Sequence, residues 1–344
     1  MEKNIRLLII YTGGTIGSRP RKGGDPGGPL DAAPWDEIRP SVPALDDLPF
    51  AVEFLPLEAI DSSCMTPAYW LRLAREISAA HAEFDGFVIL HGTDTMAWTA
   101  SALSFLLENL GKPVVLTGAR RPLGTPRSDA GANLRGAMLA AAQGELSEVC
   151  VFFDRLLLRG NRSTKTGGAR ALFESPHCPP LGRMRRGELS LEFDQVRPWP
   201  APGEGLRVHD RLCTGVAVVN LFPGLRAEAL RRALEGDELR AAVLRTFGSG
   251  NAPDTPQFHA VIEWAVRERG LLVVNVTQCL YGRVDMGRYG PGAALAERGV
   301  VSGGDMTTEA AVTKLMFLFG RGMEAGEAAR QFLKNLRGER REAN

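Results

Sequence analysis

Two short segments of the chain place hydroxyl groups directly after runs of apolar residues. In "IIYTGGTIGS", residues 9–18, Thr15 is flanked by glycines. In "VILHGTDT", residues 88–95, Thr93 and Asp94 follow a second apolar run. A threonine hydroxyl needs a nearby base before it can act as a nucleophile, and backbone N–H groups left accessible by glycine can stabilise an oxyanion. The two segments therefore favour acyl-transfer chemistry.

A lysine that suits the same chemistry follows another apolar run. The segment "RGNRSTK", residues 159–165, ends in Lys165. A lysine acts as a base near neutral pH only where burial keeps part of it unprotonated, and a neighbouring carboxylate such as Asp94 opposes this. We therefore expect the proton to be shared among Asp94, Lys165 and a hydroxyl rather than held by one residue.

Each of these features also has a structural explanation. Glycines after a strand commonly form the tight turn of a β–α unit, Asp94 is well placed to cap a helix, and Lys165 alone would usually be a surface residue. His91 is a candidate base, but a single histidine at a strand end is more often structural. The glycine segment is not Gly-x-Gly-x-x-Gly and lacks the lysine of a phosphate-binding loop, and no Gly-x-Ser-x-Gly segment occurs. These absences disfavour a dinucleotide site, a phosphate-binding loop and a serine hydrolase of that type.

Short apolar runs alternate with segments of helical periodicity along the chain. The runs lack the polar alternation of half-exposed strands, so they are typical of strands covered on both faces of a parallel sheet. Apolar spacing predicts a helix over 95–110 and further helices over 259–270 and 305–320. The alternation indicates an α/β protein. The apolar runs lie within residues 6–17, 85–95, 112–120, 148–165, 215–224, 241–253 and 270–279.

A domain boundary is indicated at residues 196–212, which hold three prolines and two glycines without periodicity. We expect a larger α/β domain over 1–195, a linker over 196–212 and a smaller α/β domain over 213–344. Residues 18–49 are rich in proline and glycine, so we expect a long loop there that acts as a lid or is disordered.

Composition excludes several classes of protein. Lys and Arg number 41 against 40 Asp and Glu, so the chain offers no electrostatic basis for binding nucleic acid. The five cysteines are scattered and never paired as Cys-x-x-Cys, which argues against a disulfide framework and a zinc site. The first apolar run is too short for a signal peptide or membrane span, and no later run reaches about 18 apolar residues. We expect a cytoplasmic protein with no nucleic-acid or membrane partner.

The two hydroxyl-bearing segments resemble a known pair of motifs. "YTGGTIGS" (11–18) and "HGTDTMAWTASAL" (91–103) are similar to the two signature motifs of the bacterial-type L-asparaginases. The resemblance runs through nearly the whole chain and fits the cytoplasmic, type I branch of that family. The further matching segments, in order, are "DSSCMTP", "LENLGKPVVLTGA", "RGNRSTK", "GSGNAP", "VNVTQC" and "GGDMTTEAAVTKL".

The resemblance implies a fold, an activity and a catalytic set. It implies a larger flavodoxin-like domain and a smaller α/β domain, assembled as a homodimer or homotetramer without metal or cofactor. It implies hydrolysis of L-asparagine to L-aspartate and ammonia. Thr15 matches the family's primary nucleophile, and Thr93, Asp94 and Lys165 match its second catalytic group.

The resemblance also implies residues that bind the substrate and an effector. Gly14 belongs to the first motif beside the nucleophile and is expected in the substrate site. Ser62, Ser63 and Asp94 match positions that hold the substrate's α-carboxylate and α-ammonium groups. Asn251 matches a residue of the small domain that usually reaches a neighbouring subunit's site. The positions that match a second, effector site in some type I relatives are Thr164, Arg245 and Cys279.

One departure from the family concerns the lid. The family usually places a tyrosine after the first motif, where it helps to activate the nucleophile, but no tyrosine lies between Tyr11 and Tyr69. We expect residues 18–32 to form the lid, with Asp25 or Asp31 as a candidate to hold a proton-accepting water. The alternatives are a broader asparagine and glutamine amidohydrolase, the amidase partner of a tRNA-dependent amidotransferase, and a catalytically weak amino-acid sensor.

Overall fold

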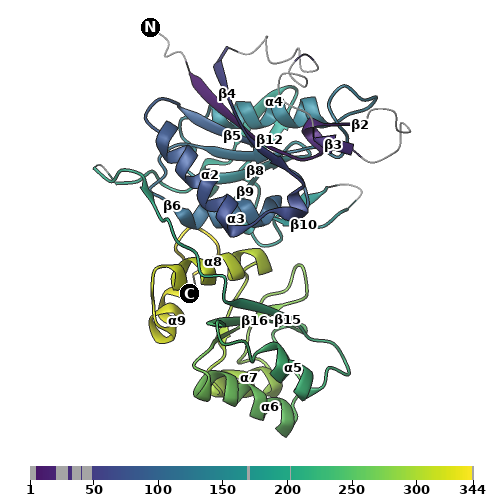
Figure 1. Cartoon of the computed structure of the whole chain (residues 1–344), viewed down its shortest axis with the longest axis vertical. Coiled ribbons are helices and arrows are strands. Elements are labelled where there is room, and N and C mark those ends of the chain that lie inside the picture. Colours follow the sequence, from purple (N-terminus) through teal and green to yellow (C-terminus); the bar gives the residue numbers. More distant parts are fainter. Residues whose placement is uncertain are drawn as a thin grey trace. The chain divides into compact units, whose positions relative to one another are not determined.

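The computed structural model describes residues 5–20, 30–32, 40, 49–168, 171–201 and 203–342. The chain forms two compact units, Met1–Asp210 and Arg211–Asn344, each built around its own sheet (Figure 1). Residues 196–212, expected to be an irregular linker, include the short strand β14 (Arg207–Val208). This strand pairs with β6 (Leu107–Glu108) of the first unit.

The first unit contains an eight-stranded sheet in the order β13-β12-β9-β8-β7-β5-β1-β4. The strands from β8 to β4 in this order are mutually parallel, and β9, β12 and β13 add antiparallel pairs at the other side. Its central strands are buried throughout, as their unbroken apolar sequences predict. The strands are β1 (Arg6–Gly13), β4 (Ala51–Ile60), β5 (Gly86–Leu90), β7 (Val114–Thr117), β8 (Val149–Phe153), β9 (Leu156–Arg159), β12 (Gly182–Arg185) and β13 (Glu188–Leu191).

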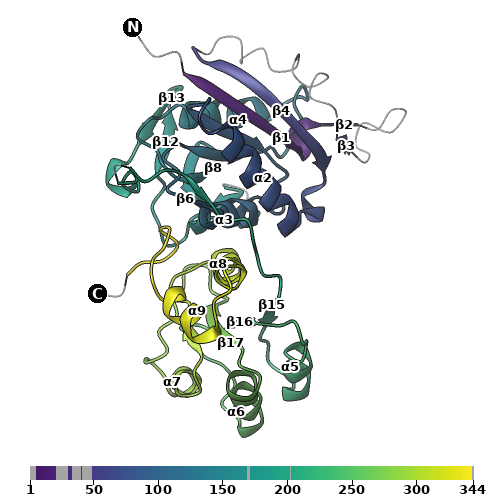
Figure 2. The same ribbon diagram turned by 60° about the vertical axis from the view of Figure 1, so that its left-hand side comes forward.

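Helices cover both faces of this sheet. Helices α2 (Pro67–Ala80) and α3 (Met96–Leu106) lie together on one face, and α4 (Ala130–Ala141) lies on the other (Figure 2). The apolar side of α4 packs on alternate residues of the central strands, among them Ile9 and Val88. The expected α/β architecture is confirmed.

Two expected elements differ in detail. Residues 148–165 were expected to hold one strand, but they form the antiparallel hairpin β8–β9, which turns at Asp154 and Arg155. The helix expected over 95–110 ends at Leu106, because the following residues pair with β14 as strand β6.

Several short elements follow the strands of this sheet. The residue after β1 leads into a 3-10 turn, and the segment between β9 and β12 contributes another turn and a two-stranded ladder. The 3-10 turns are η1 (Thr15–Gly17), η4 (Ser62–Cys64), η5 (Gly160–Arg162) and η6 (Phe193–Gln195), and the paired short strands are β2 (Ser18–Pro20) with β3 (Leu30–Ala32) and β10 (Thr164–Lys165) with β11 (Phe173–Glu174).

The second unit is built on a four-stranded parallel sheet in chain order. Helices α5 (Ala227–Ala233), α6 (Pro256–Glu263) and α7 (Gly290–Glu297) contribute to the apolar core on one face, and α6 continues as the π-helical segment Trp264–Glu268. Helices α8 (Thr308–Gly320) and α9 (Ala325–Phe332) complete the unit. The strands are β15 (Val216–Asn220), β16 (Ala241–Thr246), β17 (Leu272–Thr277) and β18 (Val301–Ser302).

Candidate active site

Close backbone packing brings the carboxyl ends of three neighbouring strands together. Gly14 follows β1 with a φ of +82°, and a Cβ atom there would lie 2.3 Å from the backbone nitrogen of Gly92, which follows β5. A Cβ atom on Gly92 would lie 2.4 Å from Oγ of Ser62, which follows β4. No side chain fits either gap, so glycine is required at both positions. The packing places Thr15, Ser62 and Thr93 at one edge of the sheet.

These residues surround a cavity of ≈ 380 Å³. Three carboxyl-end segments contribute to its wall, in agreement with the general rule for ligand sites in parallel sheets. The lining contains two aspartates and several residues with hydroxyl groups, together with two glycines. The cavity is lined by Gly14, Thr15, Ser18, Ile60, Asp61, Ser62, Gly92, Thr93 and Asp94.

Lys165 joins two of the lining residues from the neighbouring ladder β10–β11. Its Nζ donates to Thr93 Oγ1 at 2.9 Å and to Asp94 Oδ1 at 2.6 Å. The lysine side chain is 29% exposed, so it is not a freely solvated surface group. Because Nζ donates to the Thr93 oxygen, the hydroxyl proton of Thr93 is free to point elsewhere. The three residues thus form one hydrogen-bonded unit, as the sequence predicted.

Asp94 does not cap helix α3. The helix begins after Thr95, and neither Thr95 nor Asp94 makes a side-chain hydrogen bond that caps it. The backbone N–H of Asp94 donates to Ser62 Oγ at 3.3 Å, and the Thr95 hydroxyl donates to the Ser62 carbonyl at 2.7 Å. The carboxylate of Asp94 is 62% exposed and available to a ligand while it pairs with Lys165. The capping alternative is therefore wrong.

The two serines after β4 lie in different surroundings. Ser62 is buried in the cavity wall. Ser63 is exposed, is not among the lining residues, and donates both its hydroxyl (2.7 Å) and its backbone N–H (2.8 Å) to Asp61 Oδ1. The backbone hydrogen bond and then the hydroxyl bond hold the pKa of Asp61 below its usual value. The structure thus places Ser62 in the cavity wall with the other predicted residues, whereas the Ser63 hydroxyl bonds to Asp61 outside the lining.

Besides Gly92, three further lining residues had no predicted role. Asp61 stands beside the expected serines in "DSS", and that position at a strand end is the signal that could have identified it. Ser18 closes the first motif, and its hydroxyl donates to the Gly14 carbonyl at 2.8 Å, which stabilises the turn that carries Thr15. Ile60 is the last residue of β4 and contributes an apolar side chain to the cavity wall. Nothing in the sequence around Ile60 indicates that role.

His91 is a structural residue in this arrangement. It is fully buried, and its Nδ1 lies 2.6 Å from the Gly92 carbonyl, which can only accept, so Nδ1 carries the proton. Nε2 then accepts from the Thr99 hydroxyl at 2.9 Å, and Thr99 in turn accepts from the Trp70 indole. Burial lowers the pKa of His91 to about 4, so the ring is neutral at pH 7 and both nitrogens are engaged.

Other predicted residues lie in the second unit. The backbone of Asn251 exchanges hydrogen bonds with Phe247 just after β16. Arg245 on β16 donates to Asn220 Oδ1 at 3.1 Å, and Cys279 is exposed after β17. Thr164 belongs to the first unit, directly before Lys165 in β10. The roles of these four residues stay predictions.

The lid is described only at its ends. Ser18–Pro20 and Leu30–Ala32 pair as the antiparallel strands β2 and β3. Asp25 and the rest of the expected lid lie outside the described residues, and Asp31 is placed only by its backbone in β3. The expectation that a lid carboxylate serves the reaction stays a prediction.

Within the described ranges, no cluster of three or more His, Cys, Asp or Glu residues is arranged to hold a metal ion. None of the helices in this part of the chain has the length and apolar character needed to cross a membrane.

The fold and the site are those of an α/β enzyme whose cavity lies at the carboxyl ends of parallel strands and holds threonine hydroxyls beside a lysine–aspartate pair. Two family models match the chain: "Asparaginase, N-terminal" over residues 6–197 and "Glutaminase/Asparaginase C-terminal domain" over residues 215–332. The chain belongs to the asparaginase family, and the resemblance noted in its motifs is confirmed.

Individual relatives agree with this assignment. L-asparaginase 1 of Escherichia coli is 43% identical over 342 residues, which cover 97% of each chain. The crystal structure of L-asparaginase I from Vibrio cholerae superposes with a TM-score of 0.88 at 40% identity and covers 98% of this chain and 99% of that one. The thermostable L-asparaginase from Thermococcus kodakarensis also gives a TM-score of 0.88, at 34% identity, over 98% and 100% of the two chains.

Proposed function

We propose that this chain hydrolyses L-asparagine to L-aspartate and ammonia with Thr15 as its nucleophile. The observation that supports this best is the contact of Lys165 with both Thr93 and Asp94 beside a cavity that Thr15 also lines. The relatives named L-asparaginase, which match nearly the whole chain, support asparagine as the substrate.

Two acyl-transfer steps account for the reaction. Thr15 Oγ1 attacks the side-chain amide carbon of the substrate, its proton passes to the departing nitrogen, and ammonia leaves an ester on Thr15. Water then attacks the ester, and the Thr15 oxygen takes up a proton as aspartate leaves. Backbone N–H groups beside Gly14 and Gly92 are suited to stabilise the oxyanion of each step.

The unit of Thr93, Asp94 and Lys165 is proposed to move the protons. Lys165 donates to Thr93, which makes the Thr93 hydroxyl a better proton donor toward the cavity, and Asp94 balances the charge of the ammonium. A water held by Asp25 or Asp31 of the lid is the other proposed route for the Thr15 proton. Full turnover in both Asp25→Asn and Asp31→Asn would exclude that second route.

Charge in the cavity favours an α-amino acid amide. Asp94 is proposed to bind the α-ammonium group of the substrate, and Ser62 with neighbouring backbone N–H groups its α-carboxylate. Asp61 adds a second negative charge to the wall. Ser63 and Asn251 are also proposed to contribute to substrate binding. Ser63 would act through its hydrogen bond to Asp61, and Asn251 belongs to the second unit.

A steady-state assay with asparagine and glutamine tests the proposal. We expect turnover of asparagine by the wild type and a loss of about 100-fold or more in kcat for Thr15→Ala and for Thr93→Val. Thr214→Ala, at an exposed threonine of the second unit, is the matched control and should keep full activity. Normal turnover by Thr15→Ala would reject the mechanism.

The same assay separates the alternatives. Comparable kcat/KM values for both amides would indicate a broader amidohydrolase, and binding without turnover would indicate a sensor. We also propose a cytoplasmic homodimer or homotetramer, on the strength of the type I resemblance. A monomeric mass of 37.2 kDa by light scattering would contradict the assembly.

A further inference from the structure

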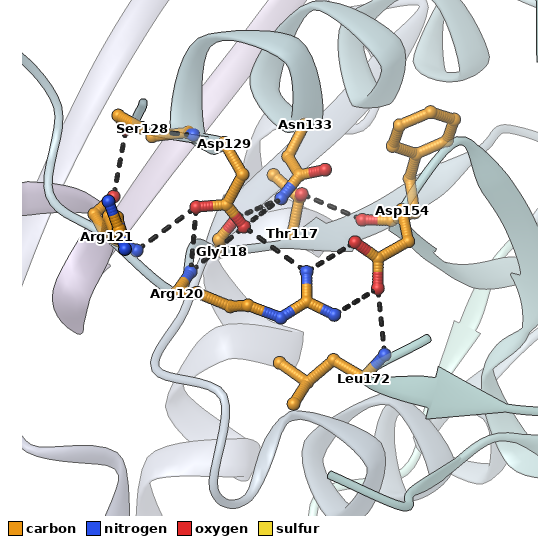
Figure 3. Close-up of polar contacts among 11 residues, drawn as sticks. Thr117, Gly118, Arg120, Arg121, Ser128, Asp129, Asn133, Asp154 and Leu172 are labelled. Carbon is orange, nitrogen blue, oxygen red and sulfur yellow. Dashed lines mark hydrogen bonds and ion pairs between the residues drawn. The ribbon is translucent and has the colours of Figure 1, made fainter. Parts of the chain in front are cut away.

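A polar network outside the cavity connects three segments of the first unit (Figure 3). It involves the loop 118–129 after β7, the turn of the β8–β9 hairpin and the residue that precedes β11. Its charged members are Arg120, Asp129 and Asp154. None of them lines the cavity, and the mechanism above does not use them.

Asp154 is the point where the network converges. Its carboxylate forms a two-point ion pair with the Arg120 guanidinium, in which Nη1 donates to Oδ1 and Nη2 donates to Oδ2 at 2.5 Å. The same Oδ2 accepts the backbone N–H of Leu172 at 2.8 Å. The Asp154 side chain is only 19% exposed. Bidentate arginine–carboxylate pairs fix geometry as well as adding energy, so this pair holds its partners in a defined position.

One arm of the network leads to the catalytic lysine. The Leu172 carbonyl accepts the N–H of Thr166, the residue after Lys165, at 2.9 Å. Lys165 itself pairs with Phe173, whose ring packs 5.3 Å from that of Phe153, directly before Asp154. The ladder β10–β11 has only two residue pairs and is separate from the main sheet. So small a ladder is marginally stable alone, and the bond from Leu172 to Asp154 is one of the contacts that tie it to the sheet, beside those of Lys165 and Phe173.

The other arm leads to the nucleophile. Asp129 accepts the N–H groups of Arg120 (3.0 Å) and Arg121 (3.1 Å), which shapes the loop after β7. Within that loop, the N–H of Leu123 donates to the carbonyl of Ile16 at 3.4 Å. Ile16 is the residue after Thr15. Arg120 therefore belongs both to the loop that supports the Thr15 turn and to the ion pair that ties down the Lys165 ladder.

We propose that Asp154 is a positioning residue of the reaction, which fixes Lys165 relative to Thr15 through its bonds to Arg120 and Leu172. The inference rests on the proposed function of Lys165. Asp154 touches no substrate in this scheme. Its effect comes through the alignment of Lys165 with Thr93, and small errors in such alignment cost much of the rate.

The substitution Asp154→Asn removes the charge and keeps the turn. Asp154 and Arg155 have φ values of +48° and +68° in a two-residue hairpin turn, and asparagine favours such positions at least as well as aspartate. We expect kcat on asparagine to fall about tenfold while KM changes less than about twofold, because alignment rather than binding is disturbed. Arg120→Met should have the same effect, and the double variant should lose little more. Arg155→Gln, in the same turn, is the matched control and should resemble the wild type.

Hydrogen exchange of the free protein gives a second readout that needs no activity. The peptide covering residues 164–174 should exchange faster in Asp154→Asn than in the wild type and Arg155→Gln. Unchanged kcat in Asp154→Asn, or unchanged exchange of this peptide, would overturn the proposal. If Asp154→Asn does not fold, Arg120→Met decides, since it leaves the bond from Leu172 to Asp154 in place. A wild type inactive on asparagine would reject the proposed function alone, and the exchange measurement would still test the link between Asp154 and the ladder.

Discussion

At the scale of single residues, Asp94 has two tasks in the proposed site. It pairs with Lys165 and also presents a carboxylate to the cavity. A simple activity loss in an Asp94 variant would not tell the tasks apart. A comparison of two substrates within each variant does, because the catalytic contribution cancels in the ratio.

We predict that the wild type discriminates strongly against succinamate, which is asparagine without its α-amino group. A site built to pair that ammonium should favour asparagine by about 10⁴-fold in kcat/KM. In Asp94→Asn the ratio should shrink by at least about tenfold, whatever happens to the absolute rates. Lys165→Met is the control, because it should lower both rates and leave the ratio unchanged. A wild-type ratio near unity would show that the carboxylate does not select the ammonium.

The sequence predicted most of this site at residue level but not the choice among local contacts. Glycine spacing and strand ends constrain where Thr15, Thr93 and Asp94 lie. Lys165 lies in the separate ladder strand β10, and the family resemblance is what indicated its role. The motifs do not reveal that the Ser63 hydroxyl bonds to Asp61. That contact depends on the backbone angles of two residues. The sequence "DSS" is equally compatible with a Ser63 hydroxyl that faces the cavity and with one that bonds to Asp61.

At the scale of elements, the sequence pattern mispredicted the bounds of one strand and one helix. The β8–β9 hairpin turns at Asp154 and Arg155 with both φ values positive. Such turns usually carry asparagine or glycine, so "FFDRLLL" indicated one continuous strand. Similarly, Leu107 and Leu110 extend the helical period of α3, but pairing of β6 with β14, about a hundred residues away, ends the helix first. Neither the turn nor the pairing with β14 can be recognised from the hydrophobic pattern of the neighbouring residues.

A buried ion pair in the second unit ties the segment after α9 to helix α8. Lys314 and Glu339 are both fully buried, and Lys314 Nζ also donates to the Phe332 carbonyl at 2.9 Å. Glu339 accepts the backbone N–H groups of Leu336 (3.0 Å) and Arg337 (2.6 Å). Burial acts to raise the pKa of Glu339, but the charge of Lys314, its hydrogen bond and the two amide donors outweigh burial and lower the pKa.

We predict that Glu339→Gln lowers the free energy of unfolding by about 3 kcal/mol at pH 7, because it leaves the Lys314 ammonium buried without its counter-charge. Urea denaturation measures the change. Glu297→Gln, at an exposed carboxylate of α7, is the matched control and should leave the midpoint unchanged.

The lowered pKa of Glu339 determines in which pH range its carboxylate stabilises the folded state. Since the folded-state pKa of Glu339 lies below its ordinary 4.5, its contribution is complete above that value and is lost as pH falls through the folded pKa. The difference between the wild type and Glu339→Gln should therefore narrow in acid. A difference that stays constant between pH 7 and pH 3 would contradict this assignment.

At the scale of the whole molecule, the two units carry separate parts of the proposed functions. The described cavity and the hydrogen-bonded set of Thr93, Asp94 and Lys165 lie within Met1–Asp210, while Arg245, Asn251 and Cys279 belong to Arg211–Asn344. The alternation of strands and helices predicted two α/β domains because it depends on local periodicity. It does not predict which residues bind a ligand, since that depends on local surfaces with no repeating pattern.

The proposed effector site is the last prediction, and it is argued from Arg245 of the second unit. Arg245 is partly buried, and Nη1 donates to Asn220 at 3.1 Å, while its buried Nε has no hydrogen-bond partner among the described residues. An unsatisfied guanidinium N–H is costly, and the carboxylate of an amino acid would satisfy it with a charge-assisted bond. Thr164 and Cys279 are the other proposed contacts.

We therefore predict sigmoidal dependence of turnover on asparagine concentration in the wild type, with a Hill coefficient above 1. Arg245→Ala should give hyperbolic kinetics, because a ligand can shift an equilibrium only through contacts that differ between the two states. Its kcat at saturating asparagine should stay close to that of the wild type. Arg232→Ala, at an exposed arginine of α5, should keep the sigmoidal curve. A hyperbolic wild-type curve would exclude cooperative activation by asparagine. The buried Nε of Arg245 would then destabilise the fold without serving an effector site.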